Sequence, residues 1–205
     1  MRVVAIDGPV GSGKSTVAKA VADRLGLPYL ESGAMYRVVA LAALRHGIDP
    51  NTEGSAGAVT ALAAEADIEI GDRITVDGAD VTADLRSPDV SRVVSAVAAM
   101  PDVRTELVRR QREWVEEHGG AVVEGRDIGS VVFPDAEVKV FLTASAAERA
   151  RRRESDETPD DLARRDLLDS TRAVSPLIVP KGAVVIDTTG RPVDDVVDEI
   201  LAFLE

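Results

Sequence analysis

The chain carries near its start the stretch Gly8-Pro9-Val10-Gly11-Ser12-Gly13-Lys14-Ser15, which fits the pattern G-x-x-x-x-G-K-[ST] at every position. An apolar run at residues 3–6 precedes it, and apolar residues at helical spacing follow it as far as Gly26. The pattern predicts a phosphate-binding loop between a strand and a helix, because the backbone N–H groups and the positive helix end surround a phosphate. Lys14 can reach the terminal phosphates and the Ser15 hydroxyl can ligate Mg²⁺. The loop predicts nucleotide binding but leaves the reaction open, since switches, motors and kinases all use it.

The composition indicates one domain with a small insertion, because 205 residues with 45% apolar content can bury one core. No stretch approaches about 18 consecutive apolar residues, and a strand rather than a leader begins the chain, so we expect a cytoplasmic protein without a membrane partner. With no cysteine and two histidines, a metal is expected on oxygen ligands, as Mg²⁺ is. The net charge of −12 argues against a nucleic-acid partner.

Strand and helix patterns alternate along most of the chain, which is typical of a parallel sheet wrapped by helices. At about residues 66–99 short alternating segments and turn residues such as Asp77-Gly78 predict an antiparallel insertion. We therefore expect an α/β fold with an inserted antiparallel subdomain. The expected strands are 2–7, 29–31, 121–123, 138–142 and 183–187, and the expected helices are 14–25, 33–46, 58–66, 101–118, 145–153, 162–171 and 193–204, with helical chain also from 88.

A second motif, Ser32 to Arg37, follows the strand expected at residues 29–31. It can be a plain helix start, with Ser32 as N-cap and Arg37 in solvent. Alternatively, since the carboxyl ends of parallel strands share one edge of a sheet, Ser32, Tyr36 and Arg37 can face the phosphate loop. A cation there would hold the phosphate of a second substrate.

A third motif, Gly125-Arg126-Asp127, follows the strand expected at 121–123. Arg126 can neutralise charge on a transferred phosphoryl group, and Asp127 can hold a ribose hydroxyl, a base amino group or a metal-bound water. The alternative is a structural ion pair between Arg126 and Asp127. Glu124 is interpreted as a packing or rim residue.

Arginines also gather on both sides of residues 154–161, a polar segment interpreted as a mobile loop. They form either a solvated charged face or a lid that brings cations to a γ-phosphate and excludes water. The charged residues of this cluster are Arg149, Arg151, Arg152, Arg153, Arg164, Arg165, Asp166, Asp169 and Arg172.

With these segments the chain resembles the bacterial cytidylate kinases, which transfer phosphate from ATP to CMP and dCMP. The most family-specific segment is 124–135, which contains Gly125-Arg126-Asp127. The other matching segments are Asp7-Gly8-Pro9, the Ser32–Arg37 helix start and Arg172-Ala173-Val174-Ser175-Pro176-Leu177. The resemblance implies the fold of the nucleoside monophosphate kinases, a core of residues 1–31, 101–148 and 172–205, a CMP-binding region at about 32–100, a short lid at about 149–171, and a monomer.

The resemblance also assigns roles by position. The ATP-binding residues would be Gly8, Pro9, Val10, Gly11, Ser12, Gly13, Lys14, Ser15, Thr16, Arg149 and Arg153. The CMP-binding residues would be Ser32, Tyr36, Arg37, Ser95, Arg104, Arg126, Asp127, Arg165, Asp169 and Arg172, with Ser95, Arg104 and Asp127 reading the cytosine. The catalytic residues would be Lys14, Arg126, Arg165 and Arg172.

Three points stay open at the level of sequence. The carboxylate that supports Mg²⁺ beside Ser15 is Asp7, Asp127 or Asp187, because each ends an expected strand. A nucleotide-dependent switch is disfavoured, since the chain has no Asn-Lys-x-Asp motif. A kinase of a small metabolite such as shikimate or a sugar acid would share the loop and the lid, but it would not need the long insertion.

Overall fold

The computed structural model describes residues 1–71, 73–153 and 158–204. The chain divides into two compact units, one made of residues 1–31 with 112–205 and the other of residues 32–111. The finer division into core, CMP-binding region and lid stays a proposal.

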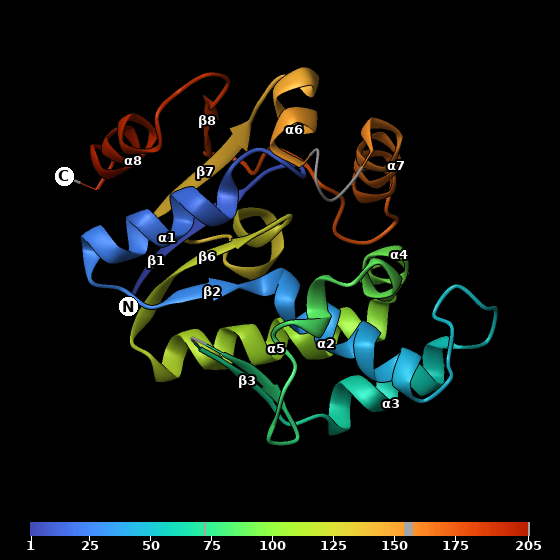
Figure 1. Cartoon of the computed structure of the whole chain (residues 1–205). Coiled ribbons are helices and arrows are strands. Elements are labelled where there is room, and N and C mark those ends of the chain that lie inside the picture. Colours follow the sequence, from blue (N-terminus) through green and yellow to red (C-terminus); the bar gives the residue numbers. More distant parts are fainter. Residues whose placement is uncertain (72, 154–157, 205) are drawn as a thin grey trace. The chain divides into compact units, whose positions relative to one another are not determined.

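The first unit is built on a five-stranded parallel sheet with the strand order β2-β6-β1-β7-β8 (Figure 1). The central strands β1 (Arg2–Asp7) and β6 (Gly120–Gly125) are buried along almost their whole length. Such continuous apolar runs are expected where helices cover both faces of a parallel sheet. The other strands are β2 (Tyr29–Glu31), β7 (Val138–Thr143) and β8 (Val184–Asp187).

Helices enclose this sheet with an aliphatic core. α1 (Lys14–Leu25) packs against α8 (Val193–Leu201), and both bury valines against the strands. Gly26 ends α1 in the left-handed conformation, which a glycine adopts without strain. The remaining helical segments are the π-helical turn η2 (Ile128–Val132), α6 (Ala146–Arg153), α7 (Pro159–Ser170) and the end of α5 (Pro101–Glu117).

The second unit combines helices with a small antiparallel sheet. Strands β3 (Ile68–Ile70), β4 (Ile74–Val76) and β5 (Ala79–Asp80) pair antiparallel in sequence order. Asp77 and Gly78, which join β4 and β5, have φ angles of 51° and 76°. Two positive φ angles are typical of the tight hairpin turn that the sequence predicts here. The helices are α2 (Ser32–Arg45), α3 (Ala56–Glu65), the short η1 (Asp84–Arg86), α4 (Pro88–Val97) and the first part of α5.

The expected fold class is confirmed, and one boundary is wrong. The segment 154–161 was expected to be loop throughout, but α7 already begins at Pro159, because proline is well suited to the first position of a helix. Residues 154–157 of that segment lie outside the described residues.

One buried carboxylate joins the ends of β1 and β6. Asp7 accepts the N–H of Ile128 at 2.8 Å and that of Gly129 at 2.7 Å, one on each oxygen. Burial raises the pKa of Asp7 to about 6, although the two backbone hydrogen bonds lower it. The carboxylate therefore holds the start of η2 beside the last residue of β1, where the phosphate loop begins.

We expect Asp7→Ala to lower the free energy of unfolding by about 2 kcal/mol, because it leaves two buried N–H groups unpaired while removing a costly buried charge. Urea unfolding measures the change. The matched control is Asp198→Ala, which removes only an exposed ion pair with Arg24 and should cost less than about 1 kcal/mol. Equal losses in the two variants would contradict the prediction.

Candidate active site

The phosphate loop follows β1 and depends on glycine at two close approaches. A Cβ atom at Gly8, where φ is 150°, would collide with the carbonyl oxygen of Leu142. At Gly11, where φ is 76°, it would lie 2.9 Å from the carbonyl oxygen of Arg149. The loop is therefore packed directly against the first turn of α6.

Each backbone carbonyl of residues 8–12 accepts a hydrogen bond from a side chain. In order from Gly8 to Ser12, the donors are Arg126 (3.1 Å), Lys14 (2.8 Å), Arg149 (3.1 Å), Arg152 (3.3 Å) and Thr188 (3.0 Å). A trans peptide points its C=O and the following N–H in opposite directions, so a carbonyl held by a side chain also fixes the direction of the next N–H group. The N–H of Ser12 is turned within the loop and donates to Pro9 at 3.4 Å.

A cation cluster lies beside the loop. Asp169 accepts from Nε of Arg126 at 2.7 Å and from Nη2 of Arg172 at 3.0 Å, so one carboxylate is shared by two guanidinium groups. Arg165, which is 8% exposed, and Lys14, which is 6% exposed, add two further positive charges. The carboxylates of Asp7 and Glu124 also act on Lys14, so buried charges of both signs gather beside the loop.

The pKa directions in this cluster reflect burial and these opposing charges. Burial, together with the charge of Arg126, lowers the pKa of Lys14 to about 7. Burial opposes ionisation of Arg126 as well, but Asp169 outweighs it and the pKa of Arg126 is raised. Burial would raise the pKa of Asp169, yet Arg126 and Arg172 keep it below its ordinary value.

Glu124 is the functional candidate that the sequence reasoning missed. It is 4% exposed and accepts the Ser15 hydroxyl at 2.5 Å and the Tyr29 hydroxyl at 3.2 Å. Burial and Glu124 together raise the pKa of Tyr29, which keeps that phenol protonated as a donor. Of the two interpretations of Glu124 from the sequence, packing or rim, its burial excludes the rim position. The signal was its place near the end of the strand next to β1, since Asp7 pairs with Gly125.

The oxygen atoms around Ser15 fit Mg²⁺. Among the described residues no three His, Cys, Asp or Glu side chains gather to form a metal cage, and Mg²⁺ bound with substrate phosphates needs only one or two protein ligands. Of the carboxylates expected to help, Asp7 is occupied by two N–H groups and Oδ1 of Asp187 accepts from Thr189. Asp127 is buried, and Glu124 is the carboxylate that contacts Ser15.

Two buried polar groups in the same place can donate hydrogen bonds to an anion. In the part of the chain that the structure describes, the hydroxyl of Ser12 and Nε of Arg149 are buried without a hydrogen-bond partner. Phosphate oxygens are acceptors that both groups can use. The residues of the loop therefore fit a nucleotide polyphosphate with its metal.

The arginines after β7 divide by burial and contact. Arg149 donates to Asp166 at 2.6 Å as well as to the loop, and its side chain is 15% exposed. Arg153 is half-buried at the end of α6. Arg151 and Arg164 are exposed, which for these two residues agrees with the interpretation of the cluster as a solvated charged face. Arg152, which the predicted ATP-binding set omits, contacts the loop directly.

The predicted substrate residues of the second unit lie on three of its helices. Tyr36 on α2 and Arg104 on α5 are buried, with the guanidinium 5.5 Å from the ring centroid. Arg37 donates to the carbonyl of Leu85 at 3.0 Å and to the hydroxyl of Ser91 at 3.2 Å. Ser32, also buried, begins α2, and a half-buried Ser95 lies on α4.

Comparison with known proteins identifies the family. The family described as "Cytidylate kinase" matches residues 4–205. The chain belongs to the cytidylate kinase family. It is 49% identical to the cytidylate kinase of Symbiobacterium thermophilum over 97% of this chain and 94% of that one. The cytidylate kinase of Pelotomaculum thermopropionicum is 46% identical over 97% and 94% of the two chains.

Solved structures support the fold alone. A gluconokinase from Sinorhizobium meliloti 1021 superposes with a TM-score of 0.53 at 18% identity, covering 99% of this chain and 91% of that one. Membership of the cytidylate kinase family makes the protein a phosphotransferase that acts on nucleotides. Over residues 1–71, 73–153 and 158–204, no helix has the length and apolarity needed to cross a membrane.

The lowered pKa of Lys14 predicts proton uptake when phosphates bind. Below pH 7 Lys14 is already charged, whereas above its pKa of about 7 it is largely neutral and a bound anion restores the charge. At pH 8 we expect uptake of close to one proton per ATP, and less at pH 6.

Calorimetric titrations of ATP in buffers of different ionisation enthalpy measure this uptake. Lys14→Met is the control and should abolish the difference between the buffers at pH 8. Identical uptake by the variant and the parent protein would show that another group takes the proton.

Proposed function

We propose that the chain transfers the γ-phosphoryl group of ATP to CMP and dCMP, which yields ADP with CDP or dCDP. The observation that supports this most is the cluster of Lys14, Arg126, Arg165 and Arg172 beside a phosphate loop, in which Arg126 and Arg172 share the carboxylate of Asp169. Phosphoryl transfer requires positioning and charge stabilisation more than covalent chemistry by the protein. Relatives that share nearly half of the residues are cytidylate kinases.

The donor is proposed to bind the loop from Gly8 to Thr16, with Arg149 and Arg153. Lys14, Arg126 and Arg149 now donate to loop carbonyls, and phosphate oxygens are stronger acceptors for the same groups. These cations would exchange a carbonyl for a phosphate. The loop carbonyls thus keep them close to where the phosphates are needed.

Mg²⁺ is proposed to be held by the Ser15 hydroxyl, with Glu124 as the carboxylate that supports it. When bound, the ion neutralises charge on the β- and γ-phosphates. In the structure Glu124 accepts the Ser15 hydroxyl hydrogen and so turns the oxygen lone pairs of Ser15 away from itself. Tyr29 donates to the same oxygen of Glu124 and restrains its orientation.

In the proposed transfer step, a phosphate oxygen of CMP attacks the γ-phosphorus in line with the bond to the leaving ADP. Lys14, Arg126, Arg165 and Arg172 stabilise the charge on the equatorial oxygens. Asp169 restrains Arg126 and Arg172 through its two oxygens, which reduces the entropy lost when they bind phosphate. Whether Asp169 also contacts CMP stays a prediction.

Recognition of cytosine is assigned to Asp127, a carboxylate that is 5% exposed. A buried carboxylate accepts from the 4-amino group of cytosine, whereas uracil presents a carbonyl there, which has no hydrogen to donate. Roles of Ser32, Tyr36, Arg37, Ser95 and Arg104 toward CMP remain predictions. So do the monomeric state, the cytoplasmic location and the lack of a nucleic-acid partner.

Release of ADP across a panel of acceptors tests the proposed function. We expect turnover with CMP and dCMP, far less with UMP, AMP or shikimate, and almost none without an acceptor. Asp127→Ala should weaken CMP binding far more than ATP binding, and Lys14→Met should lower kcat about a hundredfold or more. Equal turnover without an acceptor would refute transfer to CMP. If Asp127→Ala weakened ATP and CMP binding equally, the assignment of Asp127 to cytosine would be wrong.

The role of Glu124 predicts a changed dependence on magnesium. Glu124→Gln keeps an acceptor for Ser15 and Tyr29 but removes the charge, so the Mg²⁺ concentration for half-maximal activity should rise about tenfold. The KM for CMP should change little. The control is Glu137→Gln, which lies in an exposed pair with Arg2 and should leave the Mg²⁺ dependence unaltered. An unchanged Mg²⁺ requirement in Glu124→Gln would return the role to Asp127.

A further inference from the structure

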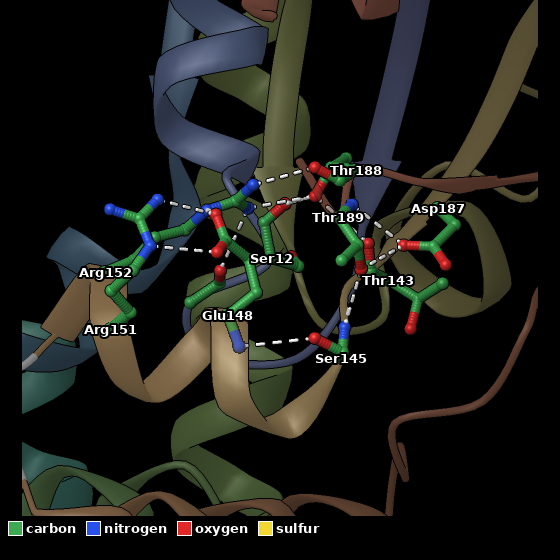
Figure 2. Close-up of polar contacts among 10 residues, drawn as sticks. Ser12, Thr143, Ser145, Glu148, Arg151, Arg152, Asp187, Thr188 and Thr189 are labelled. Atoms are coloured by element: carbon green, nitrogen blue, oxygen red, sulfur yellow. Dashed lines mark hydrogen bonds and ion pairs between the residues drawn. The ribbon is translucent and has the colours of Figure 1, made fainter. Parts of the chain in front are cut away.

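Two of the five side chains that hold the loop carbonyls have no part in the proposed transfer step. They are Arg152 on α6 and Thr188, the residue after β8 (Figure 2). Lys14, Arg126 and Arg149 have an alternative partner in the phosphates. Arg152 and Thr188 are instead bonded to each other and to further protein groups.

Thr188 is buried at 3% exposure, and its hydroxyl is fully used. It accepts from Nη1 of Arg152 at 2.9 Å and lies 3.0 Å from the carbonyl of Ser12 and 3.1 Å from that of Thr143. A hydroxyl has one hydrogen to donate. The Thr143 carbonyl already accepts the N–H of Thr188 at 2.9 Å, so Ser12 is the acceptor that needs this hydrogen.

Arg152 joins α6, the loop and the residue after β8. Its Nε donates to Glu148 at 2.9 Å, Nη1 to Gly11 at 3.3 Å and Nη2 to the carbonyl of Thr188 at 2.8 Å. A planar guanidinium directs these donors at fixed angles, which an ammonium group cannot do. Figure 2 shows the Arg152 guanidinium lying between Glu148 and Thr188.

Glu148 keeps Arg152 in this orientation. Hydrogen bonds from Arg151, and then from Arg152, lower the pKa of Glu148 to about 2, so it stays ionised at any pH where the enzyme works. The hydroxyl of Ser145 accepts the N–H of Glu148 at 3.2 Å, and the Ser145 N–H donates to Thr189 at 2.8 Å. The start of α6 is thereby bonded to the same segment that presents Thr188.

We propose that Thr188 and Arg152 are positioning residues for the donor site. Thr188 holds the Ser12 carbonyl outward and so turns the N–H of Gly13, in the same peptide unit, toward the bound phosphate. Arg152 fixes the preceding peptide through Gly11 and fixes Thr188 itself. Neither side chain contacts ATP in this proposal, which rests on the proposed ATP site.

The first test compares two neighbouring threonines. Thr188→Val removes the hydroxyl at constant volume, and we expect the KM for ATP and the Kd of ATP to rise about tenfold, which corresponds to one strong hydrogen bond. The Kd of CMP measured without ATP should stay within about twofold. Thr188→Ser keeps the hydroxyl and should restore ATP binding.

Thr189→Val is the matched control. It loses bonds of the same kind, to Asp187 at 2.6 Å and from Ser145 at 2.8 Å, but these bonds do not involve the loop. Because Thr189 is exposed, we expect Thr189→Val to lower the melting temperature no more than Thr188→Val does and to leave the Kd of ATP within about twofold. If both variants weaken ATP equally, or if Thr188→Val weakens ATP and CMP alike, Thr188 is only structural and the proposal fails.

A second pair separates Arg152 from its neighbour. Arg151 pairs with Glu148 as well, but its side chain is 69% exposed. Arg152→Gln should weaken ATP binding about tenfold, Arg152→Lys should restore it only in part because the fork is lost, and Arg151→Gln should leave it nearly unchanged. If Arg152→Lys restored ATP binding in full, the charge of Arg152 alone would be sufficient and the positioning role would be overturned.

These outcomes are separable from failure of the proposed function. Calorimetric binding of ATP needs no acceptor, so the comparison of Thr188 and Thr189 stands even if the acceptor panel shows no transfer to CMP. Conversely, normal transfer to CMP with unchanged ATP binding in Thr188→Val would refute only the positioning role. Circular dichroism of each variant establishes that it is folded before binding is compared.

Discussion

The carboxylate of Asp7 is the constraint on which the donor site depends. Its two oxygens accept the N–H groups of Ile128 and Gly129, which lie after the neighbouring strand of the sheet. The pair of bonds sets the end of β1 against the start of η2, so the phosphate loop and the segment containing Arg126 leave the sheet at the same place. Burial of the carboxylate raises its pKa to about 6. The two backbone hydrogen bonds offset part of the cost of burying the charge, and a neutral side chain would accept them less strongly.

Side chains from several segments hold the carbonyls of the loop. Those of residues 8–12 accept from Arg126 after β6, from Lys14 on α1, from α6 and from the residue after β8. Glycine supplies the backbone freedom and the close approach to α6, but glycine alone specifies no single conformation. The hydrogen bonds to the carbonyls restrict the peptides of the loop to one orientation.

The groups that hold the loop carbonyls differ in what the proposals ask of them. Lys14 is buried with its pKa lowered to about 7, and Arg126 shares the carboxylate of Asp169 with Arg172. In the proposed function these cations act on the phosphates of the substrate. Arg152 shares Glu148 with Arg151 and is also bonded to Thr188, and in the proposed positioning role it keeps these protein partners.

Local patterns in the amino-acid sequence were sufficient to predict much of the fold of this protein and its phosphate loop. The loop from Gly8 to Ser15, the alternation of strand and helix and the turn at Asp77-Gly78 are encoded within short windows, because glycine conformation, helix periodicity and strand alternation act over a few residues. The resemblance built on Gly125-Arg126-Asp127 led to the family that the comparisons confirm. Tertiary structure alone decided the partners: Glu124 with Ser15, Asp169 with Arg126, and Thr188 with a carbonyl 176 positions earlier. Such contacts leave no periodic signal, since any donor can satisfy a backbone carbonyl and only the packing of distant segments brings the two within hydrogen-bond distance.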